Sequence, residues 1–323
     1  MNRKRYTNMD PAAGLSTFSD LRKWRKERSG KVKDLSFVVK TSPDKDPGYL
    51  KANRSEMTIT WIGHSTFLLQ KNGLNLVTDP VWASRMGFDK RLAEPGLELG
   101  ELPPVDAVLL SHGHYDHLHI GSLRALPGKP KLLVPEGLGK MLRRKGFDDI
   151  QELSWWGSHE LGGLRFHFVP AQHWTRRSLT DTNTSHWGGW IIEDAGKPGE
   201  DPDSLYFAGD SGYFQGFRMI GERFRIGCAL MPIGAYEPEW FMSTQHVSPE
   251  EAVQAFLDTQ ADIFVPMHYG SFRLADDTPQ EALDRLRLNW EQRKLDPRRL
   301  KVLLHGQTLK TDLSGAVNKF PAE

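Results

Sequence analysis

The sequence predicts an α/β domain whose strands form two β-sheets, with helices on the outside. Two observations favour this fold class. Apolar runs of strand length, bounded by turn residues, recur from Met57 onward, and helical stretches are interspersed among them. About ten strands would be difficult to close over a core as one twisted sheet, so we expect two sheets.

Residues 1–56 differ from the rest because they are dense in Lys and Arg and contain no buried-strand pattern. We interpret them as an N-terminal extension and residues 57–323 as the catalytic domain. The stretch TFSDLRKW at 17–24 starts with a capping box and repeats apolar residues at a spacing of three, which predicts a short basic amphipathic helix. We expect this helix to pack on the main domain, and contact with lipid headgroups is the alternative.

The elements of the catalytic domain follow from its apolar periodicity. Strands are expected, in chain order, at MTITWIG, TFLLQ, LNLVTDP, AVLLSH, KLLVP, LRFHFVP, WGGWIIED, SLYFAGD, ALMPIG, DIFVPMH and KVLLHGQ. Helices are expected at residues 117–126, 135–144, 248–258 and 279–295. The third helix has the clearest start, since Ser248 is an N-cap, Pro249 occupies the first helical position and Glu251 completes a capping box.

The stretch SHGHYDHL joins the AVLLS strand to the first of these helices, so it forms a strand-to-helix turn. It carries four ligand-type side chains, namely His112, His114, Asp116 and His117. This spacing indicates a metal, and one ion cannot readily take all four from so short a loop, so we expect two adjacent ions. Cys228 is the only cysteine, so nitrogen and oxygen ligands are expected, which favour divalent zinc first, then manganese or iron.

Three further candidates follow apolar runs at corresponding places: His173 after FVPAQ, Asp210 after SLYFAG and His268 after IFVPM. Loops beyond strand ends face the same edge of a sheet, so these side chains can complete the site. We predict that His112 and His114 share one ion with His173. Asp116 and His117 would share the other with His268, and Asp210 would bridge the two ions together with a hydroxide.

Several motifs, taken together and in this order, resemble a known family. They are WIGHST, VTDP, SHGHYDHL, ELSWW, AQHW, DTNTSHWGGW, FAGDSGYF, IGERF, MPIGAYEPEWFM, QHVSPEEAV, MHYGSF and LLHGQT. The sequence resembles the N-acyl-phosphatidylethanolamine-hydrolysing phospholipase D group of the metallo-β-lactamase superfamily. The H-x-H-x-D-H box alone marks the superfamily, whereas the GAYEPEWFM…QHVSPEEAV block is more particular. The resemblance covers roughly residues 57–308 and leaves the N-terminal extension unmatched.

The resemblance implies an αββα sandwich, with two mixed β-sheets flanked by helices and a dinuclear site at the sheet edges. Its metal ligands fall on His112, His114, Asp116, His117, His173, Asp210 and His268, the same set reached from spacing. It also favours Asp79 in LVTDP as an acceptor that orients a metal-bound histidine, although a plain turn carboxylate is the alternative.

The activity that follows is a metal-dependent phosphodiesterase of phospholipase D type. Attack by a metal-bridging hydroxide would convert N-acyl-phosphatidylethanolamine to N-acylethanolamine and phosphatidate. Asp116 and Asp210 are the expected catalytic carboxylates. His246 in QHVSP would hold a phosphate oxygen or protonate the leaving group, and packing of its loop is the alternative. The alternative is a dinuclear-metal lactonase or sugar-phosphate hydrolase, because such a site does not by itself select phosphorus over carbon.

Other conspicuous side chains are given structural roles. His64 and His305 are interpreted as buried hydrogen-bonding histidines, and Cys228 as a core thiol. Six tryptophans either belong to the core, which we favour, or line a groove for acyl chains: Trp155, Trp156, Trp174, Trp187, Trp190 and Trp240.

Composition limits the partners. With 42 basic against 41 acidic residues, the net charge of +1 provides no global attraction to nucleic acid, and no nucleic-acid partner is expected. The charged start is followed by no apolar signal region, and no membrane-length apolar run occurs, so we expect a cytoplasmic protein. The expected partner is a phospholipid substrate. Peripheral contact with the inner face of the membrane and a homodimer are left open.

Overall fold

The computed structural model describes residues 4–10, 17–87 and 89–310, apart from the side chain of Phe18. The end of the predicted catalytic domain, residues 311–323, and the side chain that opens the apolar stripe of the predicted N-terminal helix lie outside the described residues.

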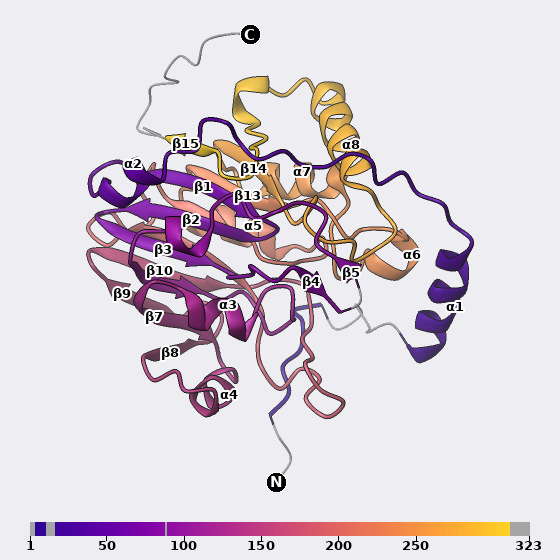
Figure 1. Cartoon of the computed structure of the whole chain (residues 1–323), viewed down its shortest axis with the longest axis horizontal. Coiled ribbons are helices and arrows are strands. Elements are labelled where there is room, and N and C mark those ends of the chain that lie inside the picture. The colour runs from indigo at the N-terminus through magenta and orange to yellow at the C-terminus, as the bar shows by residue number, and fades with distance from the viewer. Residues whose placement is uncertain (1–3, 11–16, 88, 311–323) are drawn as a thin grey trace.

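Two large sheets make up the middle of the molecule (Figure 1). The first has the strand order β15-β1-β2-β3-β6-β7-β8 and the second has the order β14-β13-β12-β11-β10-β9. The strands of the first sheet are β1 (Thr58–Gly63), β2 (Thr66–Lys71), β3 (Leu74–Thr78), β6 (Val105–Leu109), β7 (Gly128–Pro135), β8 (Ile150–Leu153) and β15 (Thr308–Lys310). Those of the second are β9 (Ser158–Leu161), β10 (Leu164–Val169), β11 (Gly189–Asp194), β12 (Leu205–Phe207), β13 (Cys228–Pro232) and β14 (Ile263–Met267). A separate small ribbon pairs β4 (Arg85–Met86) with β5 (Asp89–Lys90).

Both sheets are mixed, and their parallel parts position the site. The strands β3, β6, β7 and β8 run parallel, as do β12, β13 and β14. The strands β1, β2 and β3 pair antiparallel, as do β9, β10, β11 and β12. Because parallel strands end at the same edge, the loops that follow β6, β12 and β14 are brought to one side of the sandwich.

The apolar residues lie in layers. The largest cluster fills the space between the sheets, where Trp61, Phe67, Phe166 and Trp190 are fully buried, and continues beneath the helices that cover the second sheet. A second cluster packs the outer face of the first sheet against α2 (Pro47–Ala52), α3 (Ile120–Ala125) and α4 (Gly139–Arg144). The other sheet is covered by α5 (Gly216–Arg223), α7 (Pro249–Asp258) and α8 (Pro279–Gln292). The predicted αββα sandwich is confirmed.

The remaining helices are short or lie at the periphery. They are α1 (Phe18–Ser29), α6 (Glu239–Met242) and the 3-10 turns η1 (Leu99–Glu101) and η2 (Pro297–Arg299). The capping box of α1 joins Thr17 and Asp20. The Trp24 ring of α1 stacks on Phe241 of α6 at 5.1 Å, and its indole N–H donates to Asp276 Oδ1 at 3.1 Å. One side of α1 therefore contacts the main domain.

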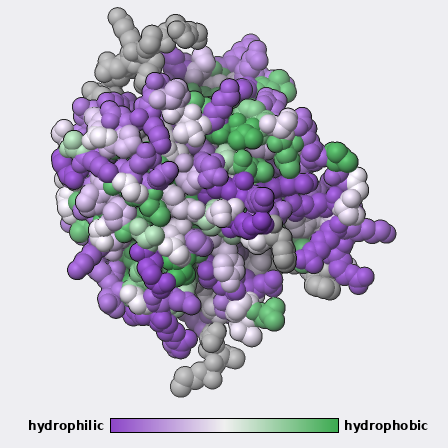
Figure 2. All heavy atoms as spheres, in the orientation of Figure 1, coloured by the Kyte–Doolittle hydropathy of each residue, from purple (hydrophilic) through white to green (hydrophobic). Residues whose placement is uncertain are grey.

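The chain after α1 also lies against the domain. Val39 is buried in the main core, and Thr41 forms a bridge with His305. On the face seen in Figure 2, hydrophilic side chains dominate α1, while apolar side chains gather where residues 36–40 cross the domain beside a cavity of about 510 Å³.

Several element boundaries differ from the sequence prediction, and two of the differences have a clear physical reason. The expected strand at KVLLHGQ is wrong, since pairing with β1 involves Thr308–Lys310 instead. Gly306, at φ 81°, donates its N–H to Trp61 O and turns the chain, so residues 301–304 stay outside the ladder. The helix expected from Pro135 begins only at Gly139, because β7 continues through Pro135. In the described part of the chain, no helix combines the length and apolarity needed to cross a membrane.

Candidate metal centre

The candidate ligands project from loops at one edge of the two sheets. His112, His114, Asp116 and His117 lie between β6 and α3, while His173 follows β10, Asp210 follows β12 and His268 follows β14. The two sheets meet here, because the Gly188 N–H donates to Ser111 O at 3.0 Å. Gly209, at φ 63°, is also required, since a Cβ at this position would lie 2.6 Å from Ser111 Cβ.

Three histidines form a first group. His112 Nε2 lies 2.9 Å from His114 Nδ1, which in turn lies 3.2 Å from His173 Nε2. His112 and His173 are 1% exposed. These are the three histidines for which sequence spacing predicted a shared ion.

The outer ring nitrogens of this group have partners that set the tautomers. His173 Nδ1 donates to Gln245 O at 2.9 Å, so its Nε2 carries the lone pair. Ser111 Oγ donates its hydrogen to Asp79 Oδ2. The same Ser111 Oγ atom can therefore only accept from His112 Nδ1, at 2.9 Å, so His112 Nε2 carries the lone pair of its ring. Two lone pairs therefore face the same space beside His114 Nδ1, an arrangement of nitrogen atoms that suits a cation.

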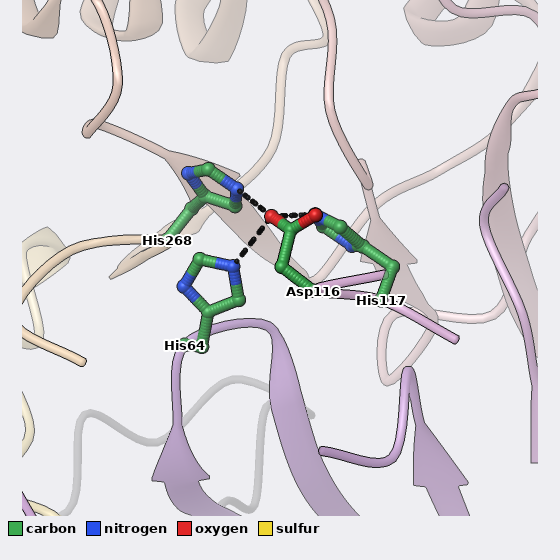
Figure 3. Close-up of side chains that lie close together, drawn as sticks. All are labelled: His64, Asp116, His117 and His268. Atoms are coloured by element: carbon green, nitrogen blue, oxygen red, sulfur yellow. Dashed lines mark hydrogen bonds and ion pairs between the residues drawn. The ribbon is translucent and has the colours of Figure 1, made fainter. Parts of the chain in front are cut away.

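A second group surrounds Asp116 (Figure 3). Its Oδ2 atom lies 3.1 Å from His64 Nε2, 3.3 Å from His117 Nε2 and 3.5 Å from His268 Nε2. His64 and His268 both have positive φ, at 55° and 61°, which turns their side chains out of the strand direction toward this carboxylate. The second group thus contains the predicted Asp116, His117 and His268, together with His64.

Asp210 lies between the two groups. Its Oδ2 atom is 3.1 Å from His117 Nε2, 3.2 Å from His268 Nε2 and 3.9 Å from His173 Nε2. Its Oδ1 atom is buried without a hydrogen-bond partner among the described residues. One carboxylate therefore contacts nitrogen atoms of both groups, which is the geometry of a bridging ligand.

Asp79 lies behind the second group and is fully buried. Its Oδ2 atom accepts from His117 Nδ1 at 2.6 Å, and its Oδ1 atom accepts from the Ser111 N–H at 2.7 Å. The carboxylate faces the outer nitrogen of His117, so it orients the ring and leaves Nε2 for a metal. Burial raises the pKa of Asp79, whereas His117 and Ser111 act in the opposite direction.

The electrostatics separate the two groups. Burial lowers the pKa of His114 to about 4 and holds those of His112 and His173 well below their ordinary value, so these imidazoles are neutral, as metal ligands must be. Burial also acts to lower the pKa of His268, but the carboxylates of Asp210 and Asp116 raise it to about 9. His117 is raised well above its ordinary pKa by the neighbouring carboxylates in the same way. The carboxylates around these two histidines therefore favour positive charge at this position, so the donor set fits divalent metal ions.

His246 lies at the edge of the site. Its Nδ1 atom is 3.8 Å from Asp210 Oδ2, the side chain is 14% exposed, and burial lowers its pKa to about 4. It also lines a cavity of about 180 Å³ together with Tyr236, Ser243 and Arg285. His246 can therefore reach a group bound beside Asp210, and it is neutral at pH 7.

The sequence analysis favoured a buried hydrogen-bonding role for His64 over a site role. His64 is indeed 1% exposed and lies within hydrogen-bond distance of Asp116, and this contact places it in the second group. The signal was its position at the tip of the β1–β2 hairpin, on the edge that carries the ligands. His305 is buried and its Nδ1 donates to Glu94 O, away from the site. The tryptophans divide: Trp187 and Trp190 belong to the core, Trp174 contacts the His114 ring, and Trp240 is 45% exposed.

Comparison with known proteins agrees with this fold. A family model described as the Beta-lactamase superfamily domain matches residues 74–269. Among solved structures, the metallo hydrolase Igni18 of Ignicoccus hospitalis superposes with a TM-score of 0.61 at 25% identity, covering 80% of this chain and 99% of that chain.

Two relatives carry a more specific name. The mitochondrial N-acyl-phosphatidylethanolamine-hydrolyzing phospholipase D of Saccharomyces cerevisiae is 35% identical over 243 residues, 70% of this chain and 51% of the yeast protein. The N-acyl-phosphatidylethanolamine-hydrolyzing phospholipase D 1 of Caenorhabditis elegans is 34% identical over 239 residues, 68% of this chain and 65% of the nematode protein. This chain thus spans less than two thirds of either relative. The resemblance predicted from the motifs is confirmed: the chain belongs to the metallo-β-lactamase superfamily, in a group like these phospholipases D, and is a metal-dependent hydrolase.

Proposed function

We propose that this enzyme hydrolyses N-acyl-phosphatidylethanolamine-type phospholipids to N-acylethanolamine and phosphatidate. It would use two divalent metal ions, and zinc is favoured over manganese or iron. The observation that carries the proposal is Asp210, whose Oδ2 atom contacts nitrogen atoms of both ligand groups. Bound as a pair, divalent ions supply an activated water at neutral pH and stabilise the charge that develops in an in-line displacement at phosphorus.

The ligand assignment follows the two groups. His112, His114 and His173 would hold one ion, Asp116, His117 and His268 the other, and Asp210 would bridge them. Asp79 holds the His117 ring so that its free nitrogen faces the ion. The chain offers no competing nucleophile of the usual kinds, since its sequence has no G-x-S-x-G elbow, and the buried Cys228 has a thiol pKa far above its ordinary value.

His246 takes part through hydrogen bonding. Because its pKa lies at about 4, the imidazole is neutral at pH 7 and is a poor proton donor. We therefore favour the first of its two predicted roles, in which a ring N–H donates to a non-bridging phosphate oxygen. The adjoining cavity, lined by Tyr236 and Arg285, would receive the departing ethanolamide.

The surface next to the first group suits a lipid. The loop after His173 lies on the metal-binding loop, because Arg177 donates to the carbonyl oxygens of Gly113 and Leu118, and Tyr115 donates to Arg177 O. Leu179 in this loop is 93% exposed and Tyr115 is 53% exposed. These apolar side chains lie beside the exposed Arg176, a combination that suits an anionic phospholipid surface and supports peripheral contact with the cytoplasmic face of a membrane.

Purified protein with zinc restored, offered vesicles that contain N-acyl-phosphatidylethanolamine, tests the proposal. Mass spectrometry should detect N-acylethanolamine and phosphatidate in equal amounts. Asp210→Asn should remove most of this activity, whereas Asp106→Asn, a matched change at an exposed carboxylate on β6, should retain it. If the protein did not hydrolyse the lipid but rapidly opened lactones or hydrolysed sugar phosphates, it would instead be a lactonase or a sugar-phosphate hydrolase.

A further inference from the structure

The segment Lys4–Asp10, here called the N-terminal strap, runs along the catalytic domain (Figure 1) and contacts the backbone of His173. The Tyr6 N–H donates to Asn183 O at 2.9 Å, and the Tyr6 ring, only 9% exposed, stacks on His186 at 4.4 Å. Lys4 forms an ion pair with Glu136 at 2.8 Å. Backbone pairing, ring stacking and burial together fix the strap on the loop that follows His173.

Asn8 connects the strap to a candidate ligand. Its Oδ1 atom accepts a hydrogen bond from the His173 backbone N–H at 3.0 Å and another from Trp187 Nε1 at 3.0 Å. The His173 ring is held independently, since its Nδ1 donates to Gln245 O. Asn8 thus holds the backbone of His173, while Gln245 sets the direction of its ring.

We propose that Asn8 is a positioning residue for His173, so that the N-terminal strap is a structural part of the metal centre. The inference rests on the assignment of His173 as a ligand in the proposed function.

The contacts of Asn8 predict which residue would shift if its side chain were removed. The indole N–H of Trp187 also donates to Ala171 O at 3.0 Å, so it keeps an acceptor without Asn8. The buried backbone N–H of His173 has no other acceptor among the contacts described, and an unsatisfied buried donor is unfavourable. Removing the side-chain oxygen of Asn8, Oδ1, should therefore displace His173 and leave Trp187 in place.

Cobalt titration of the metal-free full-length protein tests this without any substrate. Asn8→Ala should weaken the binding of one equivalent of cobalt about tenfold, which is the lower end of the effect of removing a residue that hydrogen-bonds a metal ligand. The visible absorption spectrum of the cobalt in this position should also change. The other equivalent, held by Asp116, His117 and His268, should bind as in the wild type. Asn8→Asp keeps the acceptor oxygen and should restore the affinity. Lys4→Ala, which removes the exposed ion pair with Glu136 and a cation–π contact with the Tyr6 ring but no contact to Asn8, should bind both equivalents normally.

Two results would overturn the proposal: wild-type affinity for both equivalents in Asn8→Ala, or equal weakening in Asn8→Asp and Asn8→Ala. If Asn8→Ala does not fold, Asn8→Ser, whose shorter side chain cannot span both donors, replaces it with the same expected weakening. Cobalt binding does not depend on which substrate is cleaved, so failure to hydrolyse the lipid would leave this test unaffected.

Discussion

Asp79→Asn provides a strong test of how the second ligand group is held. The substitution preserves the shape of a fully buried side chain and an oxygen for the Ser111 N–H, but it replaces the charged acceptor of His117 Nδ1. A hydrogen bond to a charged group contributes about 1.5–3 kcal/mol. Removing the buried charge also relieves a desolvation cost, which is the reason that burial raises the pKa of this carboxyl. We therefore expect a loss near the lower limit, about 1.4 kcal/mol, or a tenfold weaker zinc affinity.

Competition with a chromophoric chelator measures this affinity, and metal analysis gives the number of ions retained. The same titration on Asp106→Asn controls for the loss of a carboxylate elsewhere on the first sheet, and we expect no change there. If Asp79→Asn bound both zinc ions as tightly as the wild type, the orienting role assigned to Asp79 would be wrong.

Three further predictions follow. His246→Ala should lower turnover about 10²-fold with both metals bound, as expected for loss of a hydrogen-bond donor to an oxygen that gains charge in the reaction, and unchanged turnover at saturating substrate would return His246 to a packing role. Gly209→Ala should lower the free energy of unfolding, measured by calorimetry, by about 2–4 kcal/mol, because residue 209 has a positive φ and its Cβ would clash with Ser111. Gly100→Ala should leave the free energy of unfolding unchanged, because no atom lies near the added Cβ. Zinc binding at pH 7.5 should release protons, because His117 and His268 are protonated without metal. The proton release due to His268 should vanish as the pH rises through about 9. Calorimetry in buffers of different ionisation enthalpy measures this release, and a zinc-binding enthalpy that is the same in all of them would contradict the prediction.

The fold and the convergence of the candidate ligands could be predicted largely because their signals are local. The four ligands of the SHGHYDHL box are adjacent in sequence, and His173, Asp210 and His268 each follow an apolar strand. Strand ends define the edge of a sheet, so placement alone suggested that these side chains converge.

Other features depend on contacts that leave no sequence pattern. His64 joins the second group through a positive φ at a hairpin tip. Asn8 lies 165 residues before His173, and a single amide oxygen in a basic segment carries no periodicity. The strand β9 was missed because SHEL is short and half exposed. Tertiary packing, and not local propensity, determines such features.

The most direct test of the central claim, that water attacks phosphorus, is hydrolysis of N-acyl-phosphatidylethanolamine in ¹⁸O-labelled water. Mass spectrometry of the two products reports which bond was broken. Cleavage between phosphorus and the ethanolamide oxygen should place one labelled oxygen in the phosphate of phosphatidate and none in N-acylethanolamine. Label in the hydroxyl group of N-acylethanolamine would mean attack at carbon, and would contradict the mechanism proposed for this metal centre.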